Sequence, residues 1–173
     1  MEQLKTQSTN CWRLSYSLWI GFVRLAYARA INFRAPLKVD GSELLGRALF
    51  SGHCKKGKVL ASAFMQKPPS RKLSTNRLSW AQKELFISLS AQDAIKRSNK
   101  SGNRISFYGF AVFEAERLRC IKLDTGNSLD VRGSPSIKNP LHADIALPAY
   151  EDKDYDLLIA DQLIEISKFE STE

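Results

Sequence analysis

The run Arg104-Ile105-Ser106-Phe107-Tyr108-Gly109-Phe110-Ala111-Val112-Phe113 is the most strand-like stretch of this 173-residue chain. In an extended strand, successive side chains point to opposite faces. One face would carry Ile105, Phe107, Gly109, Ala111 and Phe113, and the other Ser106, Tyr108, Phe110 and Val112. Because both faces are largely apolar, the run predicts a central strand that is covered on both sides.

Shorter strands are predicted on either side of this run. Strand-like patterns occur at residues 59–65, 73–77, 119–123, 128–131 and 141–147. The first two are expected to pair with each other as a hairpin with a long loop. Residues 42–50, by contrast, are expected to form a short helical or irregular segment that Ser42 caps.

Two helices are indicated by capping residues and by apolar periodicity. Ser79 and Gln82 form a capping box, which predicts a helix over about residues 80–97. A last helix is predicted over residues 155–169, with an apolar stripe of Tyr155, Ile159, Leu163 and Ile166. Together these elements predict an α+β fold: a single domain with a mixed or antiparallel sheet flanked by two or three helices.

Residues 1–34 form an aromatic-rich N-terminal segment ahead of the single domain predicted for residues 35–173. Trp12, Trp19 and Phe22 are the kind of aromatic anchors that protein interfaces favour. The segment is therefore interpreted as a docking helix or extension that contacts a protein partner. The alternatives are that it completes the core or lies on a membrane surface. Arg24 interrupts its apolar run, so no membrane span is predicted.

Composition limits the function classes. Hydrophobic residues make up 43% of the chain and charged residues 25%, as in ordinary globular proteins. The three cysteines are an odd number without CxxC spacing, which argues against a disulfide framework and a zinc site and favours a cytoplasmic protein. The loop at residues 51–58 lacks the GxxxxGK[ST] pattern of a P-loop. No cofactor and no metal are expected.

The charge is distributed unevenly along the chain. The net charge is +8, but residues 1–104 carry 19 Lys and Arg against 5 Asp and Glu, whereas residues 105–173 carry 7 against 13. This asymmetry favours a basic face for nucleic acid or an acidic partner, unless the two halves neutralise each other in the fold. The residues expected to contact nucleic acid lie in two loops: Lys55, Lys56, Lys58, Lys67, Arg71 and Lys72.

Two polar stretches supply candidate site residues. In the stretch 139–148, His142 and Asp144 would share one face of a strand, where a histidine can act as a general base that a carboxylate orients. In the stretch 73–79, the hydroxyl of Ser74 and the guanidinium of Arg77 suit an anion. We expect these four residues to form one polar cluster. The alternative is a purely structural cluster on a solvated strand.

The chain resembles a group of small bacterial proteins with LSxxR and NPxHAxI stretches and no established activity. The resemblance spans about residues 43–145 and rests on Arg47, Ala63-Phe64, Leu73-Ser74-Thr75-Asn76-Arg77 and Asn139-Pro140-Leu141-His142-Ala143-Asp144-Ile145. It implies no mechanism. It does imply that five positions should be tested together: Arg47, Ser74, Arg77, His142 and Asp144.

The favoured interpretation is an accessory, non-catalytic bacterial protein that binds nucleic acid or a partner protein within a multi-subunit system. The basic first half and the lack of a known active-site motif are its basis. The alternative is a small enzyme or toxin-like effector that uses His142 with Arg47, Ser74 or Arg77.

Overall fold

The computed structural model describes residues 36–65, 71–80, 83–123, 126, 128–136, 139–147 and 153–172. The aromatic-rich segment at residues 1–34 and the side chain of Lys67 lie outside these ranges. The interpretation of Trp12, Trp19 and Phe22 as docking residues therefore stays a prediction.

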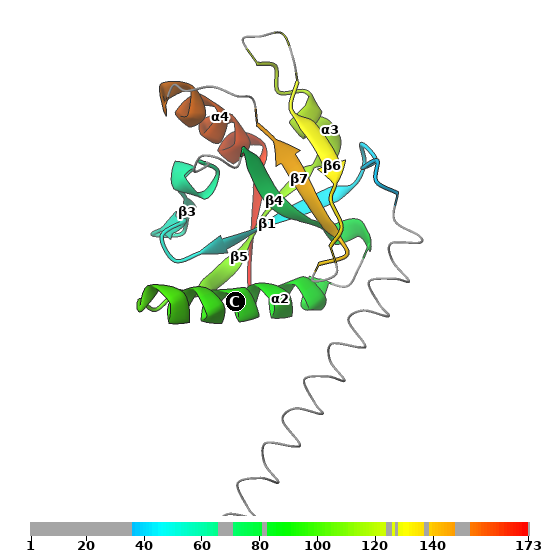
Figure 1. Cartoon of the computed structure of the whole chain (residues 1–173). Helices are drawn as coiled ribbons and strands as arrows, with labels where there is room; N and C mark the ends of the chain where they lie inside the picture. The colour runs from blue at the N-terminus through cyan, green and yellow to red at the C-terminus, as the bar shows by residue number, and fades with distance from the viewer. Residues whose placement is uncertain are drawn as a thin grey trace, which may run out of the picture.

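The described residues form a mostly antiparallel sheet with helices on both sides (Figure 1). The strands are β1 (Leu44–Phe50), β2 (Cys54–Lys55), β3 (Lys58–Val59), β4 (Lys72–Arg77), β5 (Phe107–Glu114), β6 (Asp130–Gly133), β7 (His142–Ala146) and β8 (Lys168–Ser171). The α-helices are α2 (Lys83–Ser101), α3 (Ala115–Arg119) and α4 (Lys153–Ile166), and η1 (Ala61–Ala63) and η2 (Leu78–Trp80) are 3-10 helices. This is the single α+β domain that the sequence predicts.

The main sheet has six strands in the order β6-β7-β4-β1-β5-β8. Strand β5 lies inside it, antiparallel to β1 on one side and to β8 on the other. This confirms the central strand predicted from residues 104–113. Strands β2 and β3 pair only with each other, as a small separate hairpin.

Alternate residues of β5 belong to two different cores, which places one core on each face of the sheet. Ala111 and Phe113 join the larger core, together with buried side chains of α3 and α4. Phe110 and Val112 join the smaller core beneath α2, where Phe86 and Leu141 pack against them. Figure 1 shows α2 along one side of the sheet and α4 on the other. The predicted stripe of α4 is confirmed by the burial of Tyr155, Ile159 and Leu163.

Two predictions for the first half of the domain are wrong. Residues 44–50 form strand β1, not a helical or irregular segment. Residues 59–65 do not form one strand, because Val59 ends β3 and residues 61–63 form η1. Strand β4 pairs with β1 and β7 instead of with a hairpin partner. The capping box predicted from Ser79 and Gln82 stays a prediction, because Gln82 lies outside the described residues. Helix α2 is described from Lys83 on, and the Oγ of Ser79 accepts a hydrogen bond of 2.9 Å from the backbone N of Leu44.

Two predictions for the second half also need correction. The expected strand at 119–123 is replaced by α3, which ends at Arg119, and an isolated bridge between Lys122 and Ser128. The last helix ends at Ile166 rather than at Phe169, because residues 168–171 pair with β5 as strand β8. No helix in the described ranges is long and apolar enough to cross a membrane.

Candidate functional site

Strands β1 and β4 diverge shortly after they meet. Strand β1 pairs with β5 along its whole length, but with β4 only at Leu45↔Arg77 and Gly46↔Asn76. The side chain of Arg47 lies in the wedge that this divergence opens. Its Nε donates to the carbonyl oxygen of Ala63 at 2.7 Å, and its Nη1 donates to the carbonyl oxygen of Ser74 at 3.0 Å. The guanidinium thus donates a hydrogen bond to the Ser74 carbonyl oxygen at a point where β4 has no strand partner on the β1 side.

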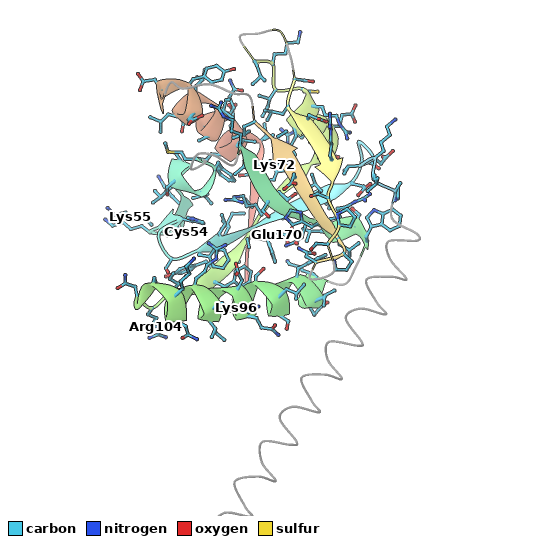
Figure 2. The ribbon with its side chains drawn as sticks, in the orientation of Figure 1. Cys54, Lys55, Lys72, Lys96, Arg104 and Glu170 are labelled. Carbon is cyan, nitrogen blue, oxygen red and sulfur yellow. The ribbon has the colours of Figure 1, made fainter. Side chains whose placement is uncertain are left out.

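A cavity of about 420 Å³ opens beside this wedge, between α2 and the sheet; we call it the α2 groove. Its lining comes from β1, β4, α2 and the segments around residues 53 and 139–142: Arg47, Ala48, Phe50, His53, Ser74, Thr75, Asn76, Leu89, Ser90, Gln92, Asp93, Lys96, Arg97, Asn139 and His142. Both histidines of the chain therefore line one groove, although they are far apart in the sequence. Figure 2 shows Lys96 on α2 and Lys55 on the β2–β3 hairpin.

The α2 groove carries an excess of positive charge. Its cations are Arg47, Lys96 and Arg97, and its one carboxylate, Asp93, pairs with Arg97 at 2.7 Å from Oδ2 to Nε. The guanidinium of Arg97 also lies over the ring of Phe50, 4.6 Å from its centroid. Within the part of the chain that the structure describes, Arg47 has no ion pair with a carboxylate. Among the described residues, its hydrogen-bond partners are the carbonyl oxygens of Ala63 and Ser74.

The positive field of the groove appears in the pKa values of two of its residues. Burial, and then the charge of Arg97, lower the pKa of Arg47 to about 10. Burial, and then the charges of Arg47 and Arg97, lower the pKa of His53 to about 4. His53 is therefore neutral at pH 7, and its Nδ1 accepts a hydrogen bond of 3.3 Å from the backbone N of Phe50. A site where cations raise the cost of further positive charge favours an anionic ligand.

The predicted contact between His142 and Ser74 is present. In the antiparallel pair β4–β7, Ser74 lies opposite Asp144 and Asn76 opposite His142, so all four side chains share the groove face. The Oγ of Ser74 forms a short hydrogen bond with Nε2 of His142. On the other side of the ring, Nδ1 lies 2.7 Å from the Oγ of Ser134 and 3.8 Å from Oδ1 of Asp144. The histidine is thus held between two hydroxyls, with a carboxylate beside it.

The prediction that Arg77 belongs to this cluster is wrong. Residues 74 and 77 differ by an odd number, so on strand β4 their side chains point to opposite faces. The Arg77 side chain is only 3% exposed, and its guanidinium forms two hydrogen bonds with the Glu43 carboxylate, at 2.6 and 2.7 Å. It also donates to the carbonyl oxygen of Pro36 at 2.5 Å, and Trp80 donates to Glu43 at 2.9 Å. This is a structural ion pair on the core side of the sheet.

The residues predicted to bind nucleic acid are spread over two places. Lys55, Lys56 and Lys58 are exposed on the β2–β3 hairpin, which follows directly on the groove residue His53. Lys72 is exposed on the groove face of β4, with its Nζ 3.9 Å from Oδ2 of Asp144. Arg71, just before β4, is half-buried.

Sequence reasoning missed His53, Lys96 and Arg97 as groove residues. In the sequence, Lys96 and Arg97 lie near the end of the predicted helix, where positive charges are favourable for the helix dipole alone. Two adjacent basic residues are a weak signal of a binding site. No pattern in the sequence predicts that this face of α2 lies beside the wedge between β1 and β4. In the described ranges, no three His, Cys, Asp or Glu side chains gather in a way that could hold a metal ion.

A second hollow of about 600 Å³ lies between α3 and α4. Its lining includes Glu114, Glu116 and Glu165 together with Arg117 and Lys122, so its charges are mixed. None of the predicted site residues belongs to it.

No protein-family model matches this sequence, and neither a curated protein nor a solved structure matches it. The resemblance to the bacterial group with LSxxR and NPxHAxI stretches therefore stays a prediction.

Proposed function

We propose that this protein binds single-stranded nucleic acid, with a backbone phosphate seated in the α2 groove. The observation that carries this proposal is the guanidinium of Arg47. It is partly buried, it has no carboxylate partner among the described residues, and a second arginine lies close enough to lower its pKa. A cation withdrawn from water is stabilised by an opposite charge, and arginine can bind a phosphate through two parallel hydrogen bonds.

The dimensions and surroundings of the groove support a single strand rather than a duplex. A cavity of about 420 Å³ is in the size range of small-ligand sites and can hold a nucleotide unit, whereas a duplex is too wide to enter it. The exposed lysines of the β2–β3 hairpin begin at Lys55, two residues after the groove residue His53. They extend the positive surface outward, as in proteins where a basic groove follows the backbone of a single strand.

Lys96→Glu is expected to weaken binding of a single strand about tenfold or more. The variant places a carboxylate in the groove, and because Lys96 is exposed on α2, the fold should be retained. Removal of one phosphate contact should also reduce the slope of log affinity against log salt by about 0.7. The measurement is fluorescence anisotropy of a labelled oligothymidylate of about 12 nucleotides in about 50 to 200 mM NaCl.

The matched control is Lys122→Glu, the same charge change at an exposed lysine of the second hollow. The affinity of Lys122→Glu for the labelled strand should stay within about twofold of that of the unchanged protein, since a distant exposed charge is largely screened at these salt concentrations. Equal losses in the two variants, or no binding by the unchanged protein at the lowest salt concentration, would contradict the proposal.

Replacing Lys55, Lys56 and Lys58 together with alanine is expected to weaken binding of all single-stranded sequences alike. Exposed lysines that contact phosphates contribute affinity without sequence preference, so the salt slope should fall by up to about 2. Oligothymidylate and a mixed-sequence strand are compared in the same anisotropy titration. A loss confined to one of the two sequences would show that the hairpin does not contact the backbone.

A further inference from the structure

We infer that Ser74 and His142 hydrolyse a phosphodiester bond of the strand that the α2 groove holds. This inference rests on the proposed function and adds a reaction to it. Its basis is the direct hydrogen bond between the Ser74 hydroxyl and Nε2 of His142 on the floor of a positively charged groove. A hydroxyl within hydrogen-bond reach of a base that a third group orients is the structural signature of an activated nucleophile.

Ser74 is placed as a nucleophile must be. It lies on β4 with an exposed side chain, and its backbone is held on both sides: by the β7 ladder, and by Nη1 of Arg47, which binds its carbonyl oxygen. The hydroxyl therefore projects from a rigid strand into the groove. Thr75, the next hydroxyl along the strand, faces the core instead and donates to the carbonyl oxygen of Ala143 at 2.9 Å.

His142 is oriented as a general base. For Nε2 to accept the proton of Ser74, the ring proton of the neutral imidazole must be on Nδ1. Nδ1 faces the Oγ of Ser134 at 2.7 Å, which can accept that proton in a hydrogen bond. Oδ1 of Asp144 lies 3.8 Å from Nδ1, close enough to stabilise the imidazolium formed during the reaction. Ser134 and Asp144 are thus positioning residues, and Ser74 and His142 are the catalytic residues.

The charges of the groove select the class of substrate. Arg47 lies next to Ser74, and Lys96 and Arg97 line the same cavity. Cations at that place stabilise the additional negative charge on the phosphoryl oxygens as the nucleophile attacks. A carboxylic ester brings no negative charge into the groove in its ground state and would gain no binding energy from these residues. A phosphodiester carries a negative charge in its ground state and gains more on its phosphoryl oxygens during the attack, so the groove cations favour it in both states.

The reaction takes place in two steps. In the first, Oγ of Ser74 attacks the phosphorus atom, the bond from phosphorus to the leaving oxygen breaks, and the Ser74 proton passes through Nε2 of His142 to that leaving oxygen. In the second, water attacks the phosphorus of the Ser74 phosphodiester and the bond from Oγ to phosphorus breaks. The water proton passes through Nε2 back to Oγ. The net reaction consumes one water and yields a phosphomonoester and an alcohol.

The test uses the full-length chain and bis(4-nitrophenyl) phosphate, a phosphodiester that releases coloured 4-nitrophenolate. The unchanged protein should release it and carry a 4-nitrophenylphosphoryl group on Ser74, detected by peptide mass spectrometry after acid quenching. Ser74→Ala should lose the adduct and reduce the rate at least about 100-fold, and His142→Gln should reduce the rate by about 10²–10⁴-fold. Ser101→Ala, a serine exposed at the end of α2 and outside the groove lining, should keep the full rate.

Binding of the labelled strand, measured on the same proteins, separates this inference from the proposed function. Ser74→Ala should still show salt-dependent binding of oligothymidylate, because the groove cations Arg47, Lys96 and Arg97 remain. A protein that binds the strand but releases no 4-nitrophenolate would overturn the inference alone, and so would release that persists in Ser74→Ala. Release from 4-nitrophenyl acetate without release from the phosphodiester would overturn it as well. Should Ser74→Ala fail to fold, Ser74→Val, which lacks the hydroxyl and favours a strand, supplies the same comparison.

Discussion

Arg77→Met is expected to lower the free energy of unfolding by about 3–5 kcal/mol at pH 7. Arg77 and Glu43 are nearly fully buried and bind each other through two hydrogen bonds. Methionine fills similar space but leaves the Glu43 carboxylate in the interior, where its remaining donors among the described residues are Trp80 and the backbone N of Asp40. Urea unfolding monitored by tryptophan fluorescence and circular dichroism gives the change.

Arg77→Met should also reverse the direction in which the Glu43 contribution to stability changes with pH. In the unchanged protein, burial raises the pKa of Glu43, but hydrogen bonds from Arg77, the Asp40 backbone and Trp80 outweigh burial and hold the pKa below its ordinary value of 4.5. The ionised carboxylate therefore stabilises the fold above pH 4.5, and this contribution is lost as the pH falls through the lowered pKa. Without Arg77, burial raises the pKa, so the deficit of Arg77→Met should shrink between pH 7 and pH 4.

The control for this pair is Arg132→Met, which removes an arginine from an exposed pair. Nε of Arg132 lies 2.5 Å from Oδ2 of Asp130, but the side chains of Arg132 and Asp130 are 79% and 45% exposed. Exposed pairs contribute less than about 1 kcal/mol. Losses of similar size in the two variants, or a deficit of Arg77→Met that grows on acidification, would show that burial does not determine the contribution of the Arg77–Glu43 pair.

Gly109→Ala is expected to detach β8 from the sheet. Gly109 has a φ of +148°, which side chains rarely adopt, and a Cβ at this position would lie 2.1 Å from the carbonyl oxygen of Glu170. Backbone strain costs about 1–3 kcal/mol, and the clash with a backbone atom adds about 1–3 kcal/mol more unless β8 moves away. The expected result is a loss of hydrogen-exchange protection in residues 168–171, together with a lower free energy of unfolding.

Gly102→Ala is the matched comparison. Gly102 also has a positive φ, +71°, but a Cβ there would meet no atom within 4 Å. This substitution carries only the backbone cost of about 1–2 kcal/mol and should leave the protection of β8 intact. If Gly109→Ala costs no more than Gly102→Ala, the close approach of β8 does not constrain that position.

The sequence predicts those elements whose own residues determine them. Strand β5 is apolar on both faces, and the stripe of Tyr155, Ile159 and Leu163 repeats at the helical period, so both elements could be predicted locally. Strand β1 could not, because Gly46 and Arg47 interrupt its apolar alternation. Its extended form depends on pairing with β5, which is distant in the sequence.

The candidate site, like the fold, has parts that could be predicted from the sequence and parts that could not. The contact between Ser74 and His142 could be predicted because both lie on short polar strands, and strand pairing joins their faces. Assigning Arg77 to that cluster ignored the alternation of side chains along β4. The α2 groove itself was not predictable, because it exists only where β1 and β4 diverge and where α2 covers the gap. The path of α2 over the sheet is not encoded in any single segment.

The brief pairing of β1 with β4 has a consequence for how the domain folds. It divides the six-stranded sheet into two three-stranded halves, β6-β7-β4 and β1-β5-β8, joined along the backbone at only two residue pairs. The chain passes between the halves at every step from β1 to β4, β4 to β5, β5 to β6 and β7 to β8. Neither half can therefore be completed before most of the chain is available, and both depend on contacts between distant residues. Such interleaving makes folding slow and cooperative. The halves cannot separate without breaking the buried Arg77–Glu43 pair and unfolding the whole domain.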